Sequence, residues 1–190
     1  METALGFLVP KLVTHVTFRL HAYRGKEALL RRLPGRLEAY RRLLQPGWLI
    51  IVLIDRDDDD CHALKQLLER SATAAHLLTR TRAAGGQFDV LNRIVIEELE
   101  AWYFGDWQAV RQAYPRVPAT IPSRTPYRDA DAIKGGTWEA LQRIMQRAGY
   151  FADGLNKRQA AERIAPHMDP VRNTSHSIQV FRDAVLAAAG

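Results

Sequence analysis

The stretch "IVLIDRDDDDCHALK", Ile51–Lys65, runs from apolar residues straight into five aspartates within six positions. The apolar run, 48–54, shows no alternation of polar and apolar residues, is rich in β-branched side chains, and is too short to cross a bilayer. These properties predict a central strand of a parallel sheet, covered on both faces. Residues 61–75 follow with apolar side chains at helical spacing. The stretch therefore predicts a strand, an acidic turn and a helix, which is the basic unit of an α/β fold.

The periodicity on both sides of this stretch extends the α/β pattern. The expected strands cover 15–23, 48–54, 76–83 and the beginning of 91–106. The expected helices cover 2–13, 26–44, 61–75 and the end of 91–106. The helix over 26–44 contains Pro34 and Gly35, which predict a break or kink there. Together these segments indicate a small, largely parallel sheet flanked by helices.

The second half of the chain has a different character. Residues 114–137 are rich in Pro and Gly and predict mostly irregular structure. Three segments with helical spacing follow, and they predict a C-terminal helical cap over 137–150, 157–168 and 175–189. We therefore expect a single domain of residues 1–190, with an α/β core over 1–113 and a loop plus helical part over 114–190.

Composition limits the functional classes. Of the 190 residues, 47% are hydrophobic, which suffices for a real core and argues against wholesale disorder. The single cysteine excludes an internal disulfide and, with no convincing signal peptide or membrane span, predicts a cytoplasmic protein without a membrane partner. The net charge of +6 is consistent with DNA or RNA as a partner, and equally with a merely solvated basic surface.

The aspartates after the central strand predict a metal site. If the backbone stays extended, Asp55, Asp57 and Asp59 project to one side, at the edge of the sheet where ligands of parallel sheets bind. Several carboxylates so close together repel one another, and a hard divalent cation, Mg²⁺ or Mn²⁺, relieves that repulsion. The alternative is that they cap the following helix and interact with its dipole.

A second acidic motif, "IEELEAW", lies at another expected junction of strand and helix. On a helix, Glu97 and Glu100 share a face, so the pair could complete the metal site begun by Asp55. First-turn acids that favour the helix dipole are an equally good explanation.

Four segments of the chain resemble a known family. They are "VLIDRDDDDCHALK", "NRIVIEELEAWYFGDWQAVRQAYP", "DADAIKGGTWEALQRI" and the region beginning "GYFADGLNKRQAAERIAPHMDP". Together they resemble domain of unknown function 4276 over nearly the whole chain. That family is similar to Toprim-like folds, so the resemblance implies Mg²⁺-dependent phosphoryl transfer, of nuclease type, in a bacterial defence setting. Asp55 and Asp57 match the D-x-D motif of Toprim-like sites.

The resemblance also implies roles for residues outside the acidic turn. Lys157, from the family-like "NKRQAA" segment, would steady developing charge beside the catalytic Asp55 and Asp57. Ser175 and Ser177 could donate to a substrate phosphate from the start of a helix, and ordinary helix capping is their alternative.

One feature of the family pattern is not found at the start of the chain. Family members generally open with a strand and a Glu-bearing turn before the helix represented here by 2–13, and we expect that strand and Glu to be missing. Their absence favours a second reading, a non-catalytic member that binds nucleic acid or protein. It would also leave a sheet edge exposed, which predicts a homodimer or an operon partner. A nucleotide hydrolase that uses the same ions is a third reading.

Overall fold

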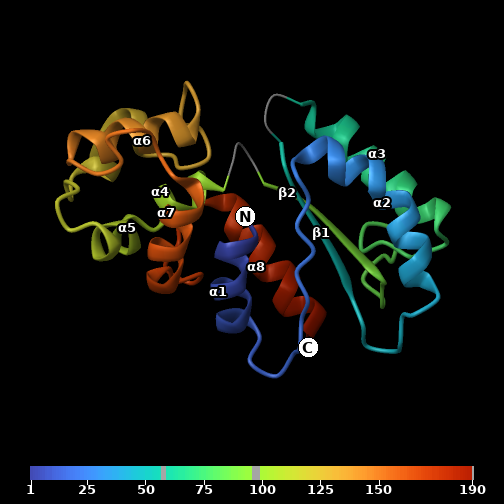
Figure 1. Cartoon of the computed structure of the whole chain (residues 1–190). Helices are drawn as coiled ribbons and strands as arrows, with labels where there is room; N and C mark the ends of the chain where they lie inside the picture. The colour runs from blue at the N-terminus through green and yellow to red at the C-terminus, as the bar shows by residue number, and fades with distance from the viewer. Residues whose placement is uncertain (57–58, 96–98, 190) are drawn as a thin grey trace. The chain divides into compact units, whose positions relative to one another are not determined.

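The computed structural model describes residues 1–56, 59–95 and 99–189 (Figure 1). The chain forms two compact units. One comprises Met1–His21 together with Ile96–Gly190, and the other comprises Ala22–Val95. None of the helices in the described ranges combines the length and the apolarity needed to span a bilayer. The expectation of a single domain over the whole chain stays a prediction, and each unit is described by itself.

The unit Ala22–Val95 contains the parallel sheet. Its elements are α2 (Lys26–Arg41), β1 (Ile50–Asp55), α3 (Cys61–Ala74) and β2 (Val90–Val95). The two strands pair in parallel over their full length, from Ile50 beside Val90 to Asp55 beside Val95. Helix α3 forms the connection between them that parallel strands require. This confirms the predicted α/β class, with a small parallel sheet flanked by helices.

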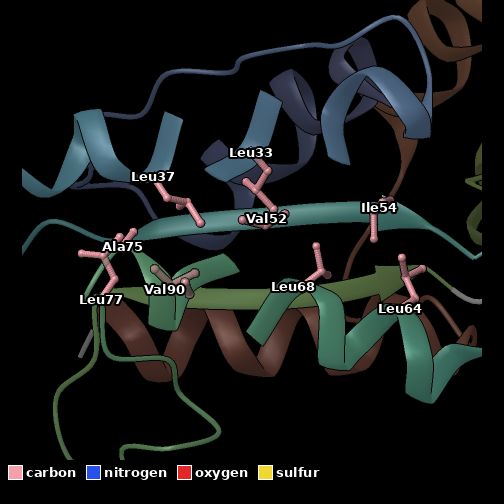
Figure 2. Packing of buried hydrophobic residues seen from close by; sticks show 10 residues of the cluster. Leu33, Leu37, Val52, Ile54, Leu64, Leu68, Ala75, Leu77 and Val90 are labelled. Carbon is pink, nitrogen blue, oxygen red and sulfur yellow. The ribbon is translucent and has the colours of Figure 1, made fainter. Parts of the chain in front are cut away.

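A single hydrophobic core holds this unit together (Figure 2). Successive side chains of a strand point to opposite faces, so Val52 and Ile54 of β1 lie on the same face of the sheet. Apolar side chains of both helices pack against this face, namely Leu33, Leu37, Leu64 and Leu68. On the opposite face, the Ile51 side chain is 38% exposed. The helices of this unit cover the face of β1 that carries Val52 and Ile54.

Two predicted strands do not form. Residues 15–23 are irregular, and Val16 and Phe18, two apolar residues of the alternating pattern, are 49% and 40% exposed. The segment 76–83 is reduced to one parallel bridge, between Thr79 and Val90. His76 has a φ of 54°, and a run of turns starts at Arg80. Alternation makes a strand only where a neighbouring strand accepts its backbone hydrogen bonds, and the described chain pairs neither segment at length.

Helix α2 does not break at Pro34, so the predicted break is wrong, whereas a kink there stays a prediction. It is continuous from Lys26 to Arg41, with Pro34 and Gly35 on its exposed side. Leu33 and Leu37, on either side of the pair, are both buried in the core. Proline lacks a backbone N–H to donate, and glycine loses much conformational freedom in a helix, so both destabilise α2. The burial of Leu33 and Leu37 outweighs these two costs.

The other unit is helical. Its α-helices are α1 (Glu2–Leu12), α4 (Glu100–Gly105), α5 (Trp107–Ala113), α6 (Thr137–Arg147), α7 (Lys157–Ile164) and α8 (His176–Ala189). They confirm the predicted helix at the N-terminus, the helix after β2 and the three helices of the C-terminal part. Between α5 and α6 the chain has only two short 3-10 turns, Ile121–Ser123 and Thr125–Tyr127, as the Pro and Gly content predicted.

A lysine attaches the N-terminal helix to the C-terminal half of the chain. The Lys11 ammonium donates hydrogen bonds to the carbonyl oxygens of Ala165, Pro166 and Met168, at 3.2, 2.7 and 2.7 Å. These carbonyls lie in and just after the 3-10 turn η3 (Ala165–His167), which directly continues α7. Lysine side chains commonly satisfy carbonyls at such helix ends.

Candidate functional site

Asp55 is the last residue of β1 and is partly buried. It pairs in register with Val95, and the Arg56 N–H continues the ladder by donating to the Val95 carbonyl at 2.9 Å. Val95 stands two residues before Glu97 in the sequence. Asp55 therefore lies at the carboxyl end of the parallel sheet, where ligand sites of such sheets form.

Lys26 supplies positive charge to the acidic turn. Its ammonium lies 2.6 Å from Asp59 Oδ2 and donates to the Arg56 carbonyl at 2.9 Å. Lys26 begins α2, far from the acidic turn in the sequence. In the sequence it looks like any first residue of a helix. Sequence reasoning missed it because nothing local links it to Asp59. One of the clustered carboxylates is thus compensated by a protein cation.

Asp60 explains part of the acidic cluster as helix capping. It is the N-cap of α3, and its Oδ1 accepts a hydrogen bond of 2.6 Å from the Ala63 N–H. A side-chain oxygen at this position satisfies one of the helix N–H groups that have no partner within the helix. For Asp60, the capping alternative is confirmed.

This cap leads to a stability prediction. Replacing Asp60 by Ala should lower the free energy of unfolding by about 1 kcal/mol, because the Ala63 N–H loses its acceptor. Urea denaturation followed by circular dichroism measures the change. Asp60→Asn should stay close to wild type, since asparagine caps helices as well as aspartate does. Equal losses in both variants would instead assign the effect to the charge.

The predicted metal ligands lie only partly within the described residues. Asp57 and Glu97 lie outside the described residues. Within the described ranges, no three His, Cys, Asp or Glu side chains come together in a way that could hold a metal ion. Metal ligation by Asp55, Asp57, Asp59, Glu97 and Glu100 therefore stays a prediction.

Glu100 and Lys157 lie close together in the helical unit. Glu100, the first residue of α4, is buried at 4% exposure, and its Oε1 lies 3.7 Å from the Lys157 ammonium. That ammonium also lies 5.1 Å from the centre of the Trp138 ring. Burial, and then the nearby Glu100 carboxylate, raise the pKa of Tyr103 well above its ordinary value. Three helices, α4, α6 and α7, thus bring a buried acid, a cation and an aromatic ring to one place.

Ser175 and Ser177 are engaged inside the protein. Both are buried at the start of α8, with their hydroxyl oxygens 3.2 Å apart. The Trp102 indole N–H donates to Ser177 Oγ at 2.7 Å, and Ser175 Oγ donates to Asp131 Oδ1 at 2.8 Å. Asp131 also accepts from the His176 N–H. The Ile178 N–H also donates to Ser175 Oγ at 3.5 Å, a contact of the capping kind for Ser175. A role of the two serines in binding substrate stays a prediction. Sequence reasoning missed Asp131, which lies in the irregular segment before α6.

Comparisons with known proteins yield one finding. The model of a family described as Domain of unknown function (DUF4276) matches residues 1–185. No curated protein and no solved structure matches the chain.

Proposed function

The chain belongs to the family Domain of unknown function (DUF4276), and from this premise we propose that it is a Toprim-like, Mg²⁺-dependent phosphoryl-transfer enzyme that acts on DNA or RNA. The observation that supports the proposal most is the position of Asp55. It is a partly buried carboxylate at the carboxyl end of a parallel strand, paired with the strand that leads into the second acidic motif.

The residues of the turn suit a magnesium ion. Mg²⁺ takes one or two carboxylates directly and keeps several waters, so it does not need a cage of protein ligands. We expect Asp55 and Asp57 to be those ligands, with Mn²⁺ able to replace Mg²⁺. When bound, the ion would neutralise charge on a substrate phosphate and activate water.

Lys26 has a supporting role in this proposal. Its ammonium binds Asp59 and the Arg56 carbonyl, so it compensates the Asp59 carboxylate even when no metal ion is bound. A cation at this position also favours the developing charge of a phosphoryl-transfer transition state.

The proposal is tested by measuring metal binding and cleavage on the same variants. Mg²⁺ or Mn²⁺ should raise the Tm of the wild type and of Asp60→Asn, and leave that of Asp55→Asn unmoved, because binding to the folded state stabilises it. Metal-dependent cleavage of labelled DNA or RNA should likewise be retained by Asp60→Asn and lost in Asp55→Asn. Asp60→Asn is the matched control, since it removes one charge from the same turn and keeps the helix cap.

Two outcomes would contradict the proposal. Equal cleavage by Asp55→Asn and the wild type would show that Asp55 is not catalytic, and a Tm that no divalent metal changes would remove the metal site. Binding of nucleic acid without cleavage, with a steep dependence on salt, would support the alternative of a non-catalytic nucleic-acid-binding member.

A further inference from the structure

Two arginines lie together at the outer edge of β2. Thr79 forms a parallel bridge with Val90, and the next residue, Arg80, donates its N–H to the Val90 carbonyl at 2.9 Å. Thr79 points toward α3, where its hydroxyl donates to Glu69. Because side chains alternate along a strand and Asn92 bonds to Glu69 of α3, Arg93 of β2 points to the opposite face. Arg80 begins a turn beside Val90, and it lies close enough to Arg93 for its charge to lower the pKa of Arg93.

Each guanidinium has a buried N–H group with no acceptor. Arg80 Nη1 and Arg93 Nε are buried, and neither has a hydrogen-bond partner in the part of the chain that the structure describes. Arg93 makes one bond, from Nη1 to the Asn92 carbonyl at 3.3 Å. Burial lowers the pKa of Arg93, and the neighbouring Arg80 lowers it further. A buried donor without an acceptor is costly, and more so when it belongs to a charged group.

The Glu69 carboxylate, which interacts electrostatically with Arg93, is already engaged. Glu69 of α3 accepts hydrogen bonds from the Thr79 hydroxyl and from Asn92 Nδ2, the latter at 2.9 Å, and lies 3.2 Å from the Lys65 ammonium. Burial raises the pKa of Glu69, but these hydrogen bonds and Lys65 outweigh it, so the pKa lies below its ordinary value. Glu69 is therefore ionised, and its hydrogen bonds connect α3 to β2. It does not accept hydrogen bonds from the buried donors of the two arginines.

We propose that Arg80 and Arg93 form a binding site for a phosphate group. Guanidinium groups present paired N–H donors that match the oxygens of a phosphate, and two of them together supply both the charge and the donors that such an anion needs. The phosphate belongs either to a free phosphate ion or to the backbone of a nucleic acid. Both ligands offer the same phosphate oxygens to the guanidinium groups. The site requires no metal, and so it stands independently of the proposed catalytic turn.

The first test measures the Tm of the full chain in EDTA, with inorganic phosphate exchanged for chloride at constant ionic strength. Once phosphate exceeds its Kd about fivefold, we expect the Tm of the wild type to rise by about 2–4 °C. Arg80→Gln and Arg93→Gln should lose this rise. Arg31→Gln, which removes the same charge from an exposed position on α2 of the same unit, should retain it.

The chloride baseline separates binding from a structural role. In chloride alone, Arg93→Gln should leave the Tm unchanged or raise it, because the substitution removes a repulsive charge and a buried donor without an acceptor. A Tm that falls by several degrees in chloride would show that the pair stabilises the fold without an anion, and would contradict the proposal.

A second measurement identifies the source of the phosphate. A short single-stranded DNA, labelled and titrated in EDTA, should bind Arg93→Gln at least tenfold more weakly than Arg31→Gln if the site takes nucleic-acid phosphates. A phosphate effect on Tm without this difference would assign the site to free phosphate. Equal responses of Arg93→Gln and wild type to both ligands would overturn the inference. Since no metal is present, that result is distinct from failure of the catalytic proposal.

Discussion

Replacing Arg172 by Ala is expected to lower the free energy of unfolding by about 3 kcal/mol, because it leaves a buried carboxylate without its charge partner. Arg172 binds Asp106 through two parallel hydrogen bonds, from Nε to Oδ1 and from Nη2 to Oδ2, both of 2.9 Å. The Asp106 side chain is fully buried, whereas that of Arg172 is 37% exposed, which places the expected loss at the lower end for buried pairs.

Asp106 also joins three parts of the helical unit. It is the N-cap of α5, where its Oδ1 accepts from the Ala109 N–H at 3.3 Å, and its Oδ2 accepts from the Asp169 N–H at 2.8 Å. The hydrogen bond to Asp106 raises the pKa of Arg172, as expected for a cation that the pair stabilises. Loss of Arg172 should therefore loosen the start of α5 and the segment around Asp169 together.

The measurement is urea denaturation of Arg172→Ala beside Arg158→Ala. Arg158 also pairs with a carboxylate, Glu162 at 2.9 Å, but its side chain is 82% exposed. Its loss should cost only about 0.3–0.5 kcal/mol, as is usual for surface pairs four residues apart on a helix. If the two variants lose the same small amount of stability, the buried pair does not hold the unit together.

Replacing Gly105 by Ala is expected to destabilise the same unit by about 1–3 kcal/mol through overpacking. A Cβ at this position would lie 2.6 Å from the Ser175 nitrogen and 2.9 Å from the Ser175 Cβ, and would overlap Asn173 Oδ1. These atoms cannot move away easily. Asn173 Nδ2 donates to the Trp102 carbonyl at 2.7 Å, and the Thr174 N–H donates to the Gly105 carbonyl at 3.0 Å. The clash is therefore with a segment held in place by hydrogen bonds.

Gly6→Ala is the matched control for this prediction. Gly6 lies inside α1, and a Cβ added there would meet no atom of another part of the chain within 4 Å. Alanine at this position should therefore raise stability by about 0.5–1 kcal/mol. Thermal denaturation of both variants gives the comparison. A Gly105→Ala protein as stable as wild type would mean that the segment around Ser175 moves away freely.

The sheet and the helices around it follow from local patterns. Three features could be predicted from a few neighbouring residues each, because each reflects the burial of its own side chains. They are the continuous apolar run of β1, the helical spacing of α3 and the change from strand to helix after β2. The pattern over 15–23 was misleading for the same reason. Its alternation is local, but a strand needs a partner, and no local pattern supplies one. Pro34 misled in the opposite direction, since the packing of Leu33 and Leu37 keeps α2 continuous.

The candidate sites also contain some features that local sequence predicts and others that depend on the tertiary structure. The sequence by itself determined that Asp55 ends a buried strand and that an acidic residue caps the next helix, since both depend on neighbours in the chain. Only the tertiary structure decided that Lys26 holds Asp59, that Arg172 neutralises Asp106, and that Arg80 lies near Arg93 at the edge of β2. Ion pairs and anion sites depend on distances between charges, and folding sets those distances between residues that are far apart in the sequence.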